Sequence, residues 1–251
     1  MKLKSYLKTE LKELLKSFKL KINFVYVLLF DAVFAAFSFL SVILFGKIAQ
    51  ELALKISSLD IQDAATLMES QADVIKSVLN SLLIYTILLV IILFAICIIT
   101  QSLIWNTILK KKLTWKYIWK FAVLNIIWLL WIAPFILILL TKEPTLIIIL
   151  TILLGILFIH FTMILYTIFT REVKIGKSLK LCFKLGVMKI RLYLIPILFA
   201  VIIFVLLNLI MTLINLIVTS VVIGLVLLII FAAWLRFYLS SVTLRAAKLN
   251  R

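Results

Sequence analysis

The chain has 251 residues, of which 66% are hydrophobic and 15% are charged, and its formal net charge is +17. A soluble domain has roughly 45–50% apolar and about 25% charged residues, so this chain has too few polar side chains to cover a globule in water. Its apolar runs of about twenty residues show no alternation, which excludes a transmembrane β-barrel and predicts membrane-spanning helices. With five Gly, three Pro and little low-complexity sequence, we expect a single integral membrane domain over residues 1–251.

The chain begins with a basic amphipathic pattern over residues 1–22. Leu11, Leu14 and other apolar residues recur three or four positions apart, while lysines such as Lys12 and Lys16 occupy the opposite side. A helix of this kind lies in the membrane interface, with its apolar stripe against the acyl chains and its lysines among the headgroups.

Six apolar segments follow, and they predict an all-α bundle of three transmembrane hairpins, each preceded by a basic interfacial helix. The predicted spans are 23–45, 79–103, 121–140, 145–169, 192–215 and 216–240. The break near Asn215 is inferred from length, because the combined run is too long for one crossing of a hydrocarbon core about 30 Å thick. Residues 46–78 form an external polar loop, in which the helical spacing of apolar residues predicts two helical extensions that meet near Ser57 and Ser58.

Positive charge predicts the orientation. Two internal basic segments, 104–120 and 170–191, are predicted as basic helices; together with 1–22 and 236–251 they hold 23 of the 27 Lys and Arg residues. Because cytoplasmic segments are enriched in Lys and Arg, we expect these segments and both termini on the cytoplasmic side of the cell membrane, in a multi-pass topology.

Nine lysines are predicted to contact lipid headgroups. They are Lys12, Lys16, Lys110, Lys111, Lys112, Lys116, Lys177, Lys180 and Lys184. Trp115, Tyr117 and Trp119 stand among lysines at the edge of an apolar run, a position typical of interface anchors. Attraction to an anionic inner leaflet, worth about 1 kcal/mol for each Lys or Arg near the surface, explains the net charge without a nucleic-acid partner.

The basic segments also resemble one another. Lys16–Leu20 (KSFKL) nearly matches Lys177–Leu181 (KSLKL), and Lys116–Phe121 (KYIWKF) parallels Lys180–Leu185 (KLCFKL). These matches fit a threefold repeat, although any apolar helix flanked by lysines has a similar pattern. The arrangement resembles the membrane domain of the glycerophosphoryl diester phosphodiesterase family and related multi-pass proteins of bacteria and archaea. In that family hydrolysis belongs to a separate soluble domain, so the resemblance implies a membrane module and not an enzyme.

A few polar residues fall inside the predicted spans, where an isolated charge costs about 2.5–3.5 kcal/mol at the helix centre. Asp31, His160 and Arg236 share a layer if the first, fourth and sixth spans adjoin, with Asn125 somewhat nearer the cytoplasm. One interpretation is a polar cluster that handles a proton or a substrate. The other is that Arg236 extends to the headgroups, His160 bonds a carbonyl, and Asp31 is paired or protonated.

The sequence offers little for catalysis. Its one His and two Cys lack the spacing of metal ligands, and we find no P-loop, dinucleotide fingerprint or Ser/His/Asp arrangement. We therefore expect no catalytic residue, metal or cofactor, and we favour a lipid-interacting, accessory or scaffold module with a possible protein partner in a membrane complex. The alternative is a small transporter or channel component that uses the intramembrane polar residues, Asn208 among them. A third hypothesis is an intramembrane enzyme that acts on lipids.

Overall fold

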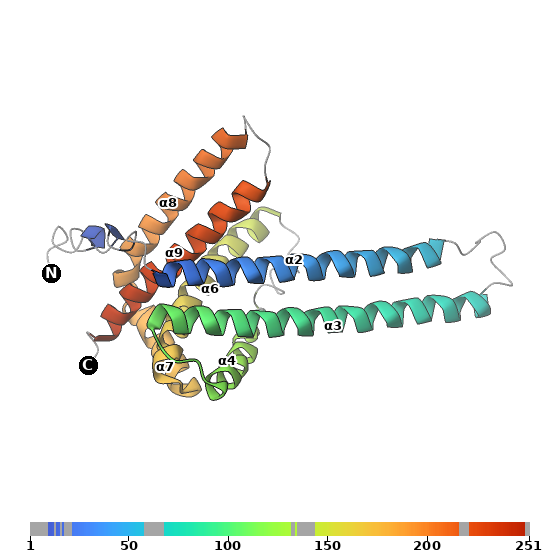
Figure 1. Ribbon diagram of the computed structural model, residues 1–251, viewed down its shortest axis with the longest axis horizontal. Coiled ribbons are helices and arrows are strands. Elements are labelled where there is room, and N and C mark those ends of the chain that lie inside the picture. Colours follow the sequence, from blue (N-terminus) through green and yellow to red (C-terminus); the bar gives the residue numbers. More distant parts are fainter. Residues whose placement is uncertain are drawn as a thin grey trace. The chain divides into compact units, whose positions relative to one another are not determined.

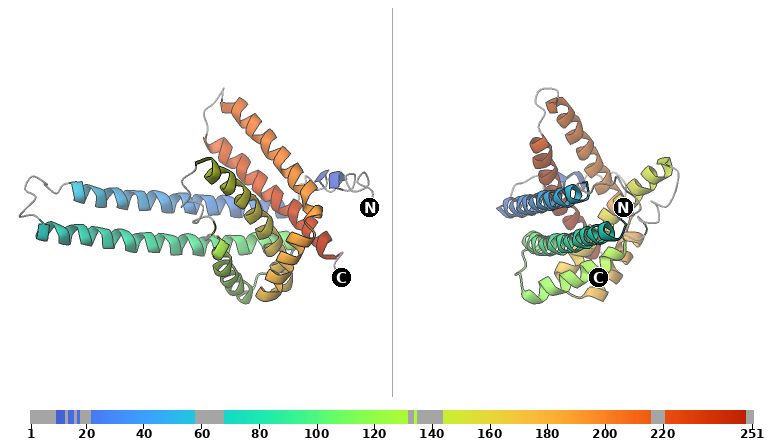
Figure 2. Two further views of the ribbon diagram at one scale, coloured as in Figure 1. Left: turned by 180° about the vertical axis from the view of Figure 1, so that it is seen from behind. Right: turned by 90° about the vertical axis from the view of Figure 1, so that its right-hand side faces the viewer.

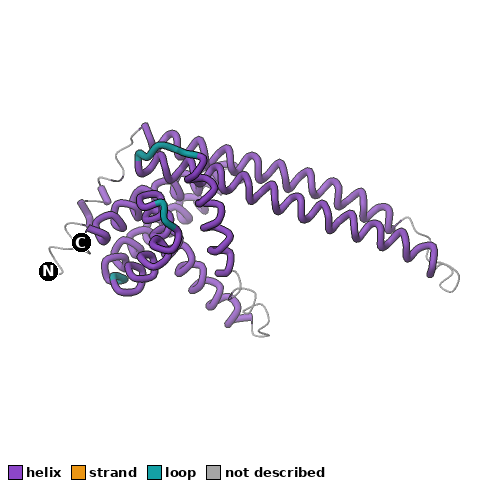
Figure 3. Tube along the Cα trace, turned by 90° about the horizontal axis from the view of Figure 1, so that it is seen from below, coloured by secondary structure: helices purple, strands orange, loops and turns teal. Residues whose placement is uncertain are grey.

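The computed structural model describes residues 10–12, 14–15, 17, 22–57, 68–131, 134, 144–215 and 221–248. The regular structure of these residues is helical, with short connecting loops (Figures 1 and 3), which confirms the predicted all-α class for this part of the chain. The helices are α2 (Ile22–Ser57), α3 (Met68–Leu109), α4 (Trp115–Trp128), the 3-10 helix η1 (Leu129–Trp131), α6 (Pro144–Glu172), α7 (Ile175–Met188), α8 (Arg191–Asn215) and α9 (Val221–Lys248).

Five of these helices are long and apolar enough to cross a membrane. Their candidate spans are Ile22–Lys55, Val74–Leu109, Thr145–Glu172, Arg191–Leu213 and Val222–Lys248. At 1.5 Å per residue, even α8, with 25 residues, rises about 38 Å and exceeds a hydrocarbon core of about 30 Å. The chain is therefore a helical membrane protein, and five of its six predicted spans coincide with such helices.

The third predicted span, 121–140, is described only in part, and its described part is not one continuous α-helix. Helix α4 begins at Trp115 and ends at Trp128, and the 3-10 turn η1 follows it directly. Its 14 residues rise about 21 Å, which is too short to cross the hydrocarbon core. Residues 132–133 and 135–143 of the predicted turn and span lie outside the described residues.

The predicted basic helix over 104–120 is not a separate element. Helix α3 continues to Leu109, and Lys110 then takes a left-handed conformation with φ 53°. Thr114 starts the next helix, because its hydroxyl oxygen accepts a hydrogen bond from the Tyr117 amide. The same amide also donates to the Thr114 carbonyl over 3.0 Å, so Thr114 caps the helix and α4 begins within the predicted segment.

Other predicted boundaries agree better with the structure. Helix α8 ends at Asn215, as expected, and α9 begins at Val221. Helix α2 continues through the predicted polar loop to Ser57, which confirms the first helical extension. Helix α3 begins at Met68, while residues 58–67 lie outside the described residues.

The third basic segment, 170–191, is shared by two helices. Helix α6 runs on to Glu172, and the separate helix α7 takes up the remainder. Between them Val173 has φ 52°, an unusual conformation for a β-branched residue. The Lys120 ammonium donates a hydrogen bond to the Val173 carbonyl over 3.2 Å, so a lysine of α4 supports this turn.

Helices α4 and α7 resemble each other, as the threefold pattern suggested, but in a different register. Both have 14 residues and bury positions that are four, seven and eight apart along the chain. The matching buried residues are Tyr117, Phe121, Leu124 and Asn125 in α4, which also buries Trp128, and Ser178, Cys182, Leu185 and Gly186 in α7. This pairing differs by three residues from the match between Lys116–Phe121 and Lys180–Leu185.

The chain divides into two compact units. One unit, Ala32–Thr100, contains the later part of α2 and the earlier part of α3, which run antiparallel (Figure 1). Many of its apolar side chains are exposed, for example Phe39 and Leu83. Such exposure suits helices whose side chains contact lipid.

The other unit comprises Met1–Asp31 and Gln101–Arg251 and contains an aromatic core. The core joins the end of α3 to α4 and α6. Ring centroids lie 5.7 Å apart for Trp105 and Tyr166, and 4.9 Å apart for Phe121 and Tyr166. These large buried rings hold the three helix segments together.

One predicted interface anchor belongs to this core. Tyr117 is only 3% exposed, its ring lies 5.4 Å from that of Phe169, and its hydroxyl is 2.7 Å from that of Thr170. In contrast, Trp115 and Trp119 are 79% and 66% exposed. The anchor prediction is therefore wrong for Tyr117, which lies on the buried side of α4.

Helices α6 and α7 pack closely where Gly186 meets Phe161. A Cβ atom at Gly186 would lie 2.4 Å from Cε1 of Phe161. Nearby, the Cys182 thiol donates to the Phe161 carbonyl oxygen over 3.2 Å. Burial raises the pKa of this thiol to about 12, so it stays protonated near neutral pH and is a poor nucleophile.

We predict that Gly186→Ala lowers the free energy of unfolding by about 1–3 kcal/mol, because the Phe161 ring must move to admit a methyl group. The matched control is Gly176→Ala in the same helix, where nothing in the described part of the chain lies within 4 Å of the added Cβ. Thermal unfolding of the detergent-solubilised protein measures both. Equal stability of the two variants would contradict the close packing.

Candidate functional site

The structure joins two of the four predicted intramembrane polar residues. Arg236 of α9 donates from Nη1 to a carboxylate oxygen of Asp31 on α2. The two side chains are 13% and 8% exposed, so the pair is largely shielded. The rings of Phe24 and Phe237 pack nearby, with centroids 5.9 Å apart. Asp31 is thus paired, as one interpretation expected, and Arg236 is bound to a carboxylate.

The other two candidates have partners of their own. His160 Nε2 lies 3.4 Å from the Gly186 carbonyl oxygen, as the carbonyl interpretation anticipated, and its ring centroid is 4.8 Å from that of Tyr193. Asn125 accepts a hydrogen bond from the Tyr166 hydroxyl and donates to the Phe121 carbonyl over 2.8 Å. The four residues therefore occupy three environments.

Asn208 lines a hollow of about 460 Å³ between α8 and α9, which lie side by side (Figure 2). Its amide donates to the Phe204 carbonyl of its own helix over 2.8 Å. Thr212 likewise donates to the Asn208 carbonyl over 3.0 Å. Because these groups satisfy backbone acceptors within α8, the described hydrogen bonds of Asn208 are intrahelical and not interhelical.

The N-terminal segment contacts α9 through two side chains that the sequence patterns missed. Both carboxylate oxygens of Glu10 accept hydrogen bonds from Arg245 Nη2, over 2.7 and 2.8 Å, and Glu10 is 1% exposed. Trp234 donates from its indole nitrogen to the Ser17 hydroxyl over 2.9 Å. A signal was present, since Glu10 is an acidic residue within a strongly basic segment.

The predicted headgroup lysines lie at the surface wherever their side chains are described. The exposed ones are Lys12, Lys110, Lys111, Lys112, Lys116, Lys177, Lys180 and Lys184, and Lys16 lies outside the described residues. Exposed apolar side chains accompany them: Trp115 and Trp119 on α4, and Val187 and Met188 on α7. Lysines and apolar groups thus share the same surface segments.

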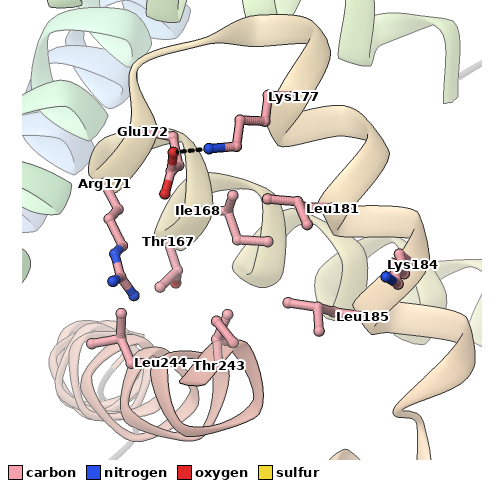
Figure 4. Close-up of a pocket in the computed structure, with 11 residues that line it drawn as sticks. Thr167, Ile168, Arg171, Glu172, Lys177, Leu181, Lys184, Leu185, Thr243 and Leu244 are labelled. Atoms are coloured by element: carbon pink, nitrogen blue, oxygen red, sulfur yellow. Dashed lines mark hydrogen bonds and ion pairs between the residues drawn. The ribbon is translucent and has the colours of Figure 1, made fainter. Parts of the chain in front are cut away.

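A cavity of about 250 Å³ lies between α6, α7 and α9 (Figure 4). Arg171 and Glu172 line it from the end of α6, and Lys177 and Lys184 line it from α7. Lys177 Nζ lies 2.5 Å from a carboxylate oxygen of Glu172. Leu244 and its neighbours on α9 form an apolar side, so the cavity combines a charged part with an apolar one.

We predict that Asp31→Asn lowers the free energy of unfolding by about 3–5 kcal/mol, because it leaves the Arg236 guanidinium shielded without its carboxylate. The double variant Asp31→Leu/Arg236→Met, which removes both charges, is expected to lose less. Thermal unfolding of single and double variants forms the cycle. Additive losses would show that the pair contributes no coupling.

No protein-family model, curated protein or solved structure matches the chain. The resemblance to the membrane domain of the glycerophosphoryl diester phosphodiesterase family therefore stays a prediction. The features of this helical membrane protein that can contact a ligand are the exposed lysines and the cavity between α6, α7 and α9.

Proposed function

We propose that the protein is a membrane-embedded module that binds anionic lipid headgroups along its basic segments and serves as a scaffold or accessory subunit for a membrane partner. The observation that carries the proposal is the joint exposure of lysines and large apolar side chains on the segment around α4 and on α7. Surfaces of this composition lie at the boundary between headgroups and acyl chains.

Helix α7 supports the proposal because it has an exposed lysine face and an opposite buried face. Lys177, Lys180 and Lys184 are three and four residues apart, so they share one face of the helix, and all three are exposed. The opposite face packs into the protein through Cys182 and Leu185. The exposed lysines are therefore accessible to headgroup phosphates, and Lys177 and Lys184 also line the cavity that α7 forms with α6 and α9.

The segment that joins α3 to α4 supports it in a second way. Lys110, Lys111 and Lys112 occupy the connection, and Trp115 and Trp119 are the exposed rings of the helix that follows. Indole rings favour the headgroup level of a bilayer, and lysines are attracted to anionic lipid. We place this segment and α7 on the cytoplasmic side of the cell membrane, together with both termini.

The proposal includes no catalytic step, and it is preferred to transport. A transport path through the predicted polar residues needs them to line one route. Instead Asp31 is bound to Arg236, while His160 and Asn125 have other partners. These contacts suit structural roles for the intramembrane polar side chains and leave lipid binding to the lysines.

We predict that the reconstituted protein enriches phosphatidylglycerol over phosphatidylcholine in its boundary lipid, and that this preference falls with salt as surface charges are screened. Replacing Lys110, Lys111, Lys112 and Lys116 by Gln is expected to remove much of the preference. Electron paramagnetic resonance of spin-labelled lipids measures the motionally restricted fraction of each lipid.

The matched control replaces Lys47, Lys55, Lys76 and Lys142 by Gln, which removes the same charge from segments predicted on the other side of the membrane. This variant is expected to keep most of the preference. Equal loss in both variants would show that only total charge matters. A wild-type protein without any preference for the anionic lipid would overturn the proposed function.

A further inference from the structure

We propose that the cavity between α6, α7 and α9 holds the phosphate of one anionic phospholipid headgroup, with Arg171 as its principal ligand. This inference rests on the proposed function and deepens it, because it assigns one stoichiometric site in addition to diffuse attraction by exposed lysines. Figure 4 shows Arg171 and Lys184 on different sides of the cavity, with apolar side chains of α6 and α7 between them.

Arg171 differs from the arginines of α9 in its ion pairing. Arg236 and Arg245, the two arginines of α9 that reach into the bundle, are each bound to a carboxylate, of Asp31 and Glu10 respectively. Among the described residues Arg171 has no such carboxylate partner, although its side chain lines a cavity. A guanidinium presents donors in a planar fork that matches two oxygens of a phosphate.

The side chains that line the cavity carry a net positive charge. Arg171, Lys177 and Lys184 supply three positive charges and Glu172 supplies one negative charge. Because Glu172 is bound to Lys177 over 2.5 Å, Arg171 and Lys184 are left to face a ligand. The C-terminal ends of α6 and α9 carry partial negative charge of about half a unit each, which reduces this excess without cancelling it.

The hydroxyl groups of the lining are already used as donors. Thr167 donates to the Met163 carbonyl over 2.7 Å, and Thr243 donates to the Leu239 carbonyl over 2.9 Å. Neither hydroxyl proton is therefore available to a ligand. The donors that remain for an anion are the cationic side chains, so the cavity favours a negatively charged ligand.

Size and apolar lining decide which phosphate compound fits. The cavity of about 250 Å³ is smaller than the roughly 300–1,000 Å³ of sites that enclose drug-sized ligands. Ile168, Leu181, Leu185 and Leu244 offer apolar contact beside the charged groups. This combination suits a headgroup with its glycerol, whose acyl chains leave along the exposed apolar surface of the helices.

The test uses the full-length protein in a non-ionic detergent with three probes: dihexanoylphosphatidylglycerol, dihexanoylphosphatidylcholine and inorganic phosphate. Isothermal titration is expected to show one equivalent of the short-chain phosphatidylglycerol, with at least tenfold weaker binding of the other two. Phosphate that binds as tightly as the lipid would overturn the lipid assignment and identify a free anion as the ligand.

Arg171→Gln is expected to weaken binding about tenfold or more, since a charge-assisted hydrogen bond contributes about 1.5–3 kcal/mol. Arg171→Lys keeps the charge but loses the fork, so an intermediate affinity is expected. The matched control is Arg191→Gln, which removes an exposed arginine that does not line the cavity. Binding lowered equally by both Gln variants would overturn the site.

A second kind of variant tests whether misfolding could explain weaker binding by Arg171→Gln. Ala247→Phe keeps every charge and fills part of the cavity, and it is expected to weaken binding while thermal unfolding shows an intact fold. Unchanged binding in both Arg171→Gln and Ala247→Phe would refute the site. The proposed function fails separately, since it depends on the boundary-lipid preference and on the lysines around α4.

Discussion

Hydrocarbon offers no hydrogen-bonding partner, and the rest of the structure follows from this constraint. The long helices satisfy their backbone groups internally, and several polar side chains within them also bond to their own helix. Thr86 donates to the Leu82 carbonyl and Asn208 donates to the Phe204 carbonyl, each one turn back. Such bonds let a polar residue sit in an apolar helix without a partner on another helix.

Charge is divided between two kinds of cation. The arginines that reach into the bundle, Arg236 and Arg245, have carboxylate partners, while exposed lysines cover α7 and the connection to α4. The division reflects side-chain chemistry: a guanidinium is weakly hydrated and forms directed pairs, whereas an ammonium is a strongly hydrated point charge. Arg171 fits neither description, since it lines a cavity but lacks a carboxylate partner among the described residues.

Sequence length and hydropathy predicted where α8 and α2 end. The break at Asn215 followed from the thickness of the hydrocarbon core, and the helical extension to Ser57 followed from apolar spacing. Within the predicted span 121–140, helix α4 ends at Trp128 and a 3-10 turn interrupts the helix, while residues 132–133 and 135–140 lie outside the described residues. Periodicity cannot detect such an interruption within a uniformly apolar run.

The polar contacts were harder to predict, because they depend on which helices adjoin. The sequence placed Asp31, His160 and Arg236 at similar depth, but depth does not determine rotation about a helix axis. Only Asp31 and Arg236 face each other, and His160 turns toward Gly186. Glu10 was missed because its partner, Arg245, lies at the far end of the chain. The cavity escaped sequence analysis for the same reason, since three helices build it.

The length of α2 has a consequence for the space outside the bilayer. With 36 residues the helix is about 54 Å long, and to fit within 30 Å of hydrocarbon it would have to tilt beyond the usual range of roughly 0–40°. Residues 46–57, which contain Lys47, Glu51 and Lys55, add about 18 Å to the helix. At a tilt within the usual range, part of α2 extends beyond the hydrocarbon core, and the charged side chains of residues 46–57 suit the aqueous side of that boundary.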